Sequence, residues 1–255
     1  SSLAALTNLY LPQNQISDLS HLSSLTALTD LDLNNNPLSA EAFATQIPAL
    51  EARGVKVTKP KPSSPTIVTF EDDSLEAVVR KAINKPEGDI LSTDVAELAE
   101  LSASKKNISS LSGIENLTAL TWISLGNNNQ ISDLSPLSSL TALTRLWLYG
   151  NKISDLSPLS SLTALTELYL SSNQISDLSP LSSLTALEVI RLDENKISDL
   201  SPLSSLTALT DLILYSNQIS DLSPLSSLTA LEVIRLNNNQ ISDLSPLSSL
   251  TALTN

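Results

Sequence analysis

Few side chains in this sequence could support catalysis or metal binding, and most of these recur at a fixed interval. Histidine occurs once, as His21, and cysteine does not occur, so disulfides and thiolate metal sites are excluded. Serine is abundant, but no base stands at a spacing that would activate it as a nucleophile. Only aspartate forms a series, in a repeated Ile-Ser-Asp-Leu segment, at Asp18, Asp133, Asp155, Asp177, Asp199, Asp221 and Asp243.

This aspartate series, the Asp column, has two interpretations. If successive units stack at about 5 Å, the like charges would repel, which would raise their pKa values or recruit cations. Alternatively, each carboxylate accepts hydrogen bonds from backbone or serine groups in its own turn. The second interpretation is favoured, because the sequence contains no calcium-loop spacing.

No other motif indicates chemistry. His21 stands where other units carry Pro136, Pro158 or Pro180, and no partner lies at ligand or triad spacing, so it is interpreted as a benign substitution. Glycine-rich phosphate loops, metal motifs and nucleophile elbows are missing. We therefore expect no enzyme activity, no cofactor and no metal site.

Net charge and hydropathy limit the classes of partner that the chain is expected to bind. The formal net charge of −13 disfavours nucleic acid, which requires a basic footprint, and anionic lipid surfaces. No apolar run approaches the roughly 20 residues that span a bilayer, and no signal peptide is recognisable. We expect neither a nucleic-acid partner nor membrane insertion.

The elements that would position these residues follow a 22-residue period. From Leu143 the chain reads Leu-x-x-Leu-x-Leu-x-x-Asn-x-Ile-Ser-Asp-Leu-Ser-Pro-Leu-Ser-Ser-Leu-Thr-Ala, and it restarts at Leu165, Leu187, Leu209 and Leu231. The unit at Leu120 has one additional residue. Alternation predicts a short strand in each unit, whose leucines point inward. Ser157 and Pro158 predict a helical turn, with the serine as N-cap.

This consensus resembles the leucine-rich-repeat family, and specifically the short units of bacterial internalins. The resemblance covers nearly the whole chain. It implies an α/β repeat solenoid: a horseshoe with a parallel concave sheet, short 3-10 or helical turns on the convex side, and small helical caps. It also implies that the recurrent asparagines lie inside the turns and bond to the backbone of adjacent coils. This Asn column comprises Asn14, Asn36, Asn151, Asn173, Asn195, Asn217 and Asn239.

The order of segments is unusual for such an array. Residues 1–58 look like two repeats followed by a C-terminal cap, with a helix over 39–50 and a strand over 55–57. Residues 59–66 form a proline-rich linker. Residues 67–117 resemble an N-terminal cap with a first irregular repeat, containing a helix over 75–83 and a second that starts at Asp94 with Glu97 in a capping box. Residues 118–255 are regular repeats that are open at their C-terminal end.

The outward strand positions form the predicted binding surface, the concave face. Both tryptophans and all four tyrosines of the chain occupy such positions. Tryptophan, tyrosine and arginine dominate interface hot spots, whereas the alternative is that aromatic residues simply suit strands. The predicted site comprises Trp122, Arg145, Trp147, Tyr149, Glu167, Tyr169, Arg191, Asp193, Asp211, Tyr215, Arg235 and Tyr10.

The sequence thus favours a non-enzymatic scaffold that binds a protein partner, with a glycan as the less favoured ligand. The resemblance to internalins implies contact with host or surface proteins, and an extracellular or cell-surface location in a bacterium. It names no specific ligand.

A second function rests on the ends of the chain. The segment 1–8 reads SSLAALTN and the segment 248–255 reads SSLTALTN, in the same repeat phase. Complementary ends predict a structural or engineered building block that associates head to tail into a ring or filament. The alternative is a piece of a natural protein with tandem arrays, because any two cuts at one phase match. The predicted contact residues are Leu3, Leu6, Asn8, Leu250, Leu253 and Asn255.

Overall fold

The computed structural model describes residues 5–39, 41–59, 65–128 and 130–254. The chain divides into two compact units, Ser1–Ser64 and Pro65–Asn255, here called unit 1 and unit 2. Each unit has its own parallel sheet and its own core.

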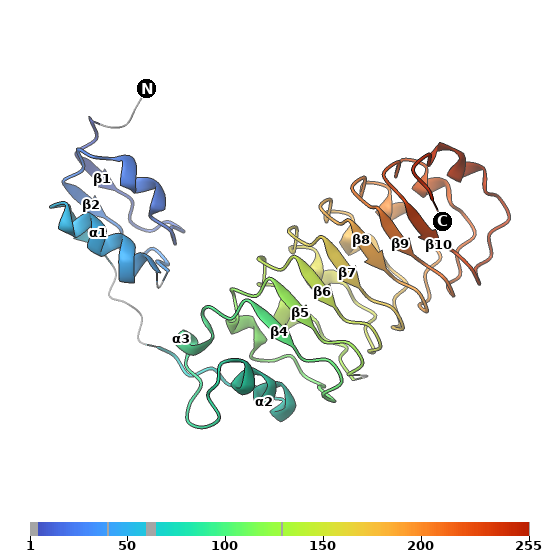
Figure 1. Ribbon diagram of the computed structural model, residues 1–255, viewed down its shortest axis with the longest axis horizontal. Coiled ribbons are helices and arrows are strands. Elements are labelled where there is room, and N and C mark those ends of the chain that lie inside the picture. Colours follow the sequence, from blue (N-terminus) through green and yellow to red (C-terminus); the bar gives the residue numbers. More distant parts are fainter. Residues whose placement is uncertain (1–4, 40, 60–64, 129, 255) are drawn as a thin grey trace. The chain divides into compact units, whose positions relative to one another are not determined.

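Unit 2 is a stack of short coils with one seven-stranded parallel sheet along one side, in the order β10-β9-β8-β7-β6-β5-β4 (Figure 1). Its strands pair in register at each repeat. They are β4 Glu100–Ser102, β5 Trp122–Ser124, β6 Arg145–Trp147, β7 Glu167–Tyr169, β8 Val189–Arg191, β9 Asp211–Ile213 and β10 Val233–Arg235. A parallel sheet needs a crossover after each strand, and the rest of each unit supplies it.

The crossovers contain 3-10 turns, as expected from the resemblance. These are η4 Ile114–Asn116, η5 Ser135–Leu137, η6 Ser157–Leu159, η7 Ser179–Leu181, η8 Ser201–Leu203, η9 Ser223–Leu225 and η10 Ser245–Ser249. Together with the parallel sheet they confirm the leucine-rich-repeat solenoid.

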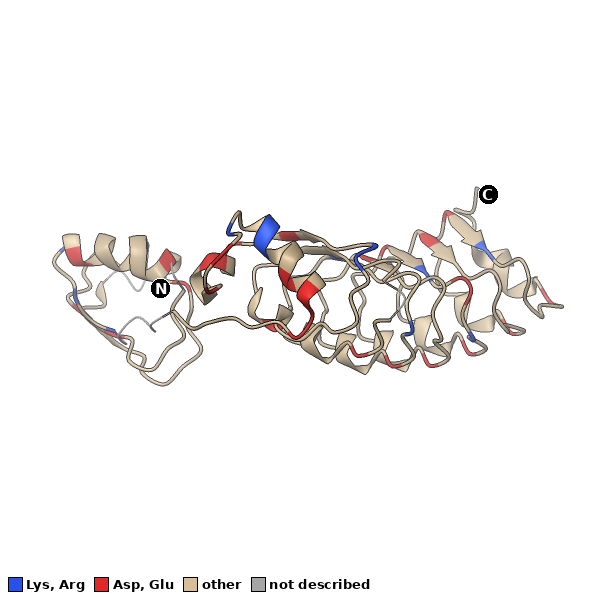
Figure 2. Cartoon of the chain, turned by 90° about the horizontal axis from the view of Figure 1, so that it is seen from below, with Lys and Arg blue, Asp and Glu red and all other residues tan. Residues whose placement is uncertain are grey.

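The capping of these turns differs from the prediction. Ser157 is not the N-cap of η6: Leu156 holds that position and makes no side-chain cap. Instead, Asp155 Oδ1 accepts hydrogen bonds from Ser157 N at 2.8 Å and from Ser157 Oγ at 2.6 Å. The carboxylate two residues upstream therefore does the capping, because it reaches the backbone amide and the hydroxyl together. Figure 2 shows acidic positions recurring along the lower edge of unit 2.

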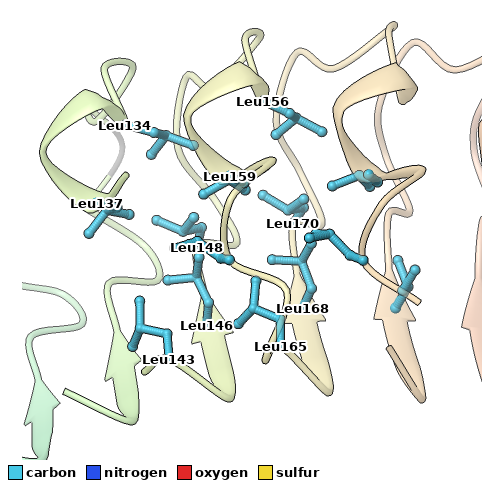
Figure 3. Close-up of a cluster of buried hydrophobic side chains, with 14 of the residues drawn as sticks. Leu134, Leu137, Leu143, Leu146, Leu148, Leu156, Leu159, Leu165, Leu168 and Leu170 are labelled. Carbon is cyan, nitrogen blue, oxygen red and sulfur yellow. The ribbon is translucent and has the colours of Figure 1, made fainter. Parts of the chain in front are cut away.

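The core of unit 2 is a continuous column of aliphatic side chains. Leu143, Leu146, Leu148 and Leu159 are all fully buried, and their equivalents in the neighbouring coils lie directly beside them (Figure 3). A single coil would leave both flanks of these side chains in water, and ordering its backbone costs about 1–2 kcal/mol per residue. Stability therefore comes from stacking coils rather than from any one of them.

The Asn column satisfies the backbone inside each turn, as the resemblance implied. Asn195 Nδ2 donates to Leu170 O of the preceding coil at 3.0 Å and to Leu192 O of its own coil at 3.1 Å. Its Oδ1 accepts from Ile175 N at 2.9 Å. The amide thus ties two coils together through buried groups.

Two members of the Asn column depart from this pattern. Asn14 is exposed, and within the described part of the chain its side chain donates only to carbonyls of its own turn. Asn151 Nδ2 still reaches Leu125 O at 3.1 Å, but its Oδ1 is buried without a partner among the described residues. The coil before Asn151 is the one with the additional residue, which explains the missing bond.

The cap at the start of unit 2 contains α2, Asp73–Ala82, and α3, Ser92–Val95. Asp72 caps α2 by accepting from Ser74 N and Leu75 N, and its second oxygen accepts from Ser109 N at 2.8 Å, which ties the cap to the first coil. The predicted start of the second helix at Asp94 is wrong. Asp94 is its third residue, and its carboxylate accepts from Leu91 N at 2.7 Å.

Unit 1 has a three-stranded parallel sheet in the order β1-β2-β3. Its strands are β1 Asn8–Tyr10, β2 Asp30–Asp32 and β3 Lys56–Thr58, and the last lies one residue beyond the predicted 55–57. The turn η2 spans Ser20–Ser24. The helix expected over 39–50 is a π-helical turn, η3 Ala42–Gln46, that continues as α1 Ile47–Ala52. Ile47 and Leu50 bury its apolar face against Leu31 and Leu33.

None of the helices in the described part of the chain is long and apolar enough to cross a membrane.

Substitution of one buried member of the Asn column should destabilise unit 2 strongly. Asn195→Ala leaves Ile175 N buried without its acceptor and removes one of the two asparagine donors to Leu170 O and to Leu192 O, so we expect a loss of about 2 kcal/mol in the free energy of unfolding. Denaturant titration followed by circular dichroism measures it. Gln174→Ala, an exposed amide beside Asn173, is the matched control and should cost less than about 0.5 kcal/mol. Equal effects of the two substitutions would contradict the role of the Asn column.

Candidate binding surface on the concave face

The parallel register turns the outward strand positions into rows. The first row runs through Trp122, Arg145, Glu167, Val189, Asp211 and Val233. The second runs through Ser124, Trp147, Tyr169, Arg191, Ile213 and Arg235. Because neighbouring strands lie about 4.8 Å apart, side chains of one row are in contact distance of each other.

Three aromatic rings, one each from β5, β6 and β7, contact one another in series. The rings of Trp147 and Tyr169 are parallel to within 3°, with centroids 5.3 Å apart. Trp122 meets Trp147 edge to face, also at 5.3 Å. Tyr149 lies beside them over Gly126, where a Cβ atom would collide with the tyrosine ring. Trp122, Trp147, Tyr149 and Tyr169 are together called the aromatic cluster.

Arginine side chains border the aromatic cluster on two sides. The Arg145 guanidinium lies 5.6 Å from the Trp122 ring centre and pairs with Glu100 at 3.3 Å. The Arg191 guanidinium lies 4.7 Å from the Tyr169 ring centre. Burial raises the pKa of the Tyr169 hydroxyl, although the positive charge of Arg191 opposes that shift. The phenol is therefore neutral and available as a hydrogen-bond donor at physiological pH.

Two shallow pockets open on this surface. The first has a volume of about 360 Å³ and is lined by the aromatic side chains Trp147, Tyr149 and Tyr169, with Ser171 and Arg191 at its margin. Its rings are half-buried, so each presents an edge or face to solvent. A pocket of this kind accepts an apolar or planar group of a partner.

The second pocket, of about 230 Å³, is charged. It is lined by residues of both signs, among them Arg191, Asp193, Asp211, Tyr215 and Arg235. Asp193 is only 6% exposed and accepts a hydrogen bond from Ser171 Oγ at 2.7 Å. A hydrogen bond to Asp193 also raises the pKa of the Tyr215 hydroxyl. Asp211 Oδ1 is buried without a partner in the described part of the chain.

Most of the predicted site residues therefore meet in unit 2, including Glu167, which lies beside Arg145 in the first row. One residue is an exception. Tyr10 lies on β1 of unit 1 and is 66% exposed. Sequence reasoning did not single out Ser171 or Gly126, because the roles of both depend on a side chain in the next coil.

Four of the predicted contact residues at the two ends lie within the described part of the chain. Asn8 begins β1, and Leu6 packs partly buried against the core of unit 1. Leu250 is buried and Leu253 is half-buried beyond β10. Leu3 and Asn255 lie outside the described residues. Association through these ends stays a prediction.

The structure decides between the two interpretations of the Asp column, and repulsion does not raise the pKa values. The pKa values of Asp133, Asp155, Asp177, Asp199, Asp221 and Asp243 are all lowered from the ordinary 3.8, and Asp18 falls to about 2. At Asp199 the hydroxyl and the backbone amide of Ser201 lower the pKa, and repulsion from the neighbouring aspartates is the smaller effect. The second interpretation, hydrogen bonding within each turn, is confirmed.

The described residues contain no cluster of three or more histidine, cysteine, aspartate or glutamate side chains that could hold a metal ion. His21 lies exposed in η2, with Asp18 nearby as its charge partner.

Acid should weaken unit 2 through the Asp column. A carboxylate whose pKa is lowered in the folded chain stabilises it above the ordinary value, and this contribution is lost as the pH falls through the folded pKa. We expect the midpoint temperature of thermal unfolding to decrease as the pH is lowered below about 4. In the variant Asp177→Asn/Asp199→Asn this decrease with pH should be less steep. Glu188→Gln is the control, since it removes an exposed carboxylate that accepts no hydrogen bond in the described structure. An unchanged slope in the double variant would refute the assignment.

Comparison with known proteins agrees with this architecture. The family model described as "Leucine Rich repeats (2 copies)" matches residues 5–49, 118–161, 163–205 and 207–249. An internalin (InlF) from Listeria monocytogenes is 39% identical, with a TM-score of 0.72, over 76% of this chain and 58% of its own. Internalin C2 from the same species is 34% identical, with a TM-score of 0.61, over 76% of this chain and 97% of its own.

No curated protein sequence matches the chain at a significant level. The chain spans little more than half the length of the internalin InlF structure. The repeat consensus, the parallel sheet with 3-10 turns, the family match and the identity to two solved internalins all agree. The chain belongs to the leucine-rich-repeat family and is a bacterial internalin-like member of it.

Proposed function

We propose that this chain is a non-enzymatic scaffold that binds a partner protein through the concave face of unit 2, outside the bacterial cell. A protein-binding role is the function class that membership of the family supports. The observation that carries the proposal is the stack of Trp122, Trp147 and Tyr169, which continues onto Arg191. Four neighbouring strands thereby present one half-buried aromatic and cationic surface.

The packing of these rings favours recognition. Each ring is held by the next one, so little side-chain entropy remains to be lost on binding. The indole N–H groups of Trp122 and Trp147 donate to no acceptor in the described residues.

A protein partner fits better than a glycan because the concave face changes from aromatic to charged along the array of repeats. The aromatic pocket lies next to the charged pocket around Asp193 and Arg235, and the two share Arg191 and Ser171. A protein surface can offer apolar and charged groups over that span together. A glycan would stack on the rings but would leave most charges unpaired.

The test uses a displayed library of extracellular protein domains selected on the whole chain. Binders should lose at least about thirtyfold in affinity for Trp147→Ala/Tyr149→Ala, since hot-spot truncation costs 2 kcal/mol or more. The control Thr163→Ala/Thr185→Ala changes exposed convex positions and should bind normally. Thermal unfolding checks that both variants are folded. Binders that respond to the convex variant and ignore the concave one would refute the proposal.

The alternative function, head-to-tail association through the predicted ends, is separable from this one. Light scattering over a wide concentration range measures the absolute mass of the chain. Association predicts a discrete larger species or a mass that grows with concentration, and proline in place of Asn8, whose N–H lies at the free edge of β1, should prevent it. A mass of 27.2 kDa at every concentration would contradict association and leave partner binding unaffected.

A further inference from the structure

The first strand of the sheet in unit 2 has an unpaired edge. β4 lies at the end of the strand order and pairs only with β5. The N–H groups of Ala103 and Lys105 donate toward β5, to Ser124 O and Gly126 O. Backbone groups alternate in direction along a strand, so those of Ser102 and Ser104 point to the opposite edge. No hydrogen bond among the described residues uses them.

A groove of about 780 Å³ lies beside β4, with α2 as its second wall. α2 turns Leu75 and Val79 into the core, where they are fully buried. Another flank of α2 lines the groove with Ala77, Val78 and Ala82. These side chains are short, and they give the groove an apolar wall opposite the edge of β4.

The charge of the groove is opposite to that of the protein. The chain carries a formal net charge of −13, yet the groove is lined by Lys81 and Lys106 and by no carboxylate. Both lysines are exposed, as is the adjacent Lys105. None of the three forms an ion pair in the described part of the chain, whereas Arg80 and Lys85 nearby are paired with Glu76 and Asp94.

We propose that the groove between α2 and β4 binds an extended acidic segment of a partner protein, which adds to the sheet as a further strand. Its backbone bonds to the free groups of Ser102 and Ser104, and strand addition of this kind supplies affinity through main-chain hydrogen bonds. An aliphatic side chain of the segment packs on Ala77 and Val78. Its carboxylates lie near Lys81 and Lys106.

This site is distinct from the aromatic cluster, and its occupant differs in kind. The concave face takes the folded surface of a partner, whereas the groove takes a single extended segment. The two sites are neighbours, because Ser104 Oγ contacts Ser124 Oγ of β5 at 2.6 Å. One partner could therefore occupy both, with its acidic segment in the groove.

The first experiment selects a phage-displayed library of random peptides, each about eight residues long, on the whole chain. The expected peptides alternate aliphatic and acidic residues and bind at least tenfold more weakly to Lys81→Glu/Lys106→Glu. Lys196→Glu, an exposed lysine on a distant coil, is the matched control and should change little. Ala77→Trp fills the groove from an exposed helix position and should abolish binding. Failure to enrich any peptide sensitive to Ala77→Trp would overturn the proposal.

The second experiment separates strand addition from simple charge attraction. The best peptide is synthesised with N-methyl groups on alternate amides, which removes hydrogen-bond donors and keeps the charges. Binding should fall at least tenfold, and the amides of Ser102 and Ser104 should exchange with solvent more slowly in the unmethylated complex. Equal binding of the methylated peptide, or of unstructured poly-glutamate, would overturn the proposal. Trp147→Ala/Tyr149→Ala should leave peptide binding intact, so failure here is distinguishable from failure of the concave face.

Discussion

The buried asparagine of each turn is the interaction on which the rest of unit 2 depends. A turn that passes over a leucine core must satisfy its inward-pointing backbone groups without water, and one side-chain amide does this for two coils together. Asn173 and Asn195 repeat the same bonds one coil apart. The amide has a fixed length, so the spacing between coils is fixed as well. That spacing keeps the leucines in contact and the strands in register.

The register of the parallel strands in turn creates the binding surface on the concave face. A single coil contributes only two outward side chains from its strand, too few to recognise a partner. Stacking in exact register brings Trp147 of one coil against Tyr169 of the next, and Tyr169 against Arg191 of the one after. The binding surface is thus a property of the array. The same logic leaves β4 exposed, because the first coil has no coil before it and α2 covers the core rather than the strand edge.

The sequence was sufficient to predict the structure wherever the interacting residues all lie within one repeat. Leucine spacing predicted the short strands and their inward positions, and the resemblance to internalins implied the parallel sheet and the role of the Asn column. Prediction was weaker where two groups compete locally, as at η6, where Asp155 caps the turn in place of Ser157. Contacts between coils were the hardest to predict from the sequence. Neither the stacking of Trp147 on Tyr169 nor the packing of Tyr149 over Gly126 has a sequence signature within one repeat. The groove beside β4 escaped notice for the same reason, because its walls are about 20 positions apart in the chain.

The unpaired oxygen of Asn151 has a consequence for how this protein can evolve. It marks the junction between the coils of β5 and β6, where the asparagine ladder lacks one bond. The edge-to-face contact of Trp122 with Trp147 and the placement of Arg145 over Trp122 cross that same junction. Side chains that are exposed for recognition therefore also stabilise the weakest junction between coils in the array. Mutations that retune specificity at Trp122 or Trp147 carry a stability cost there, whereas the coils beyond β8, whose ladder is complete, are free to diversify.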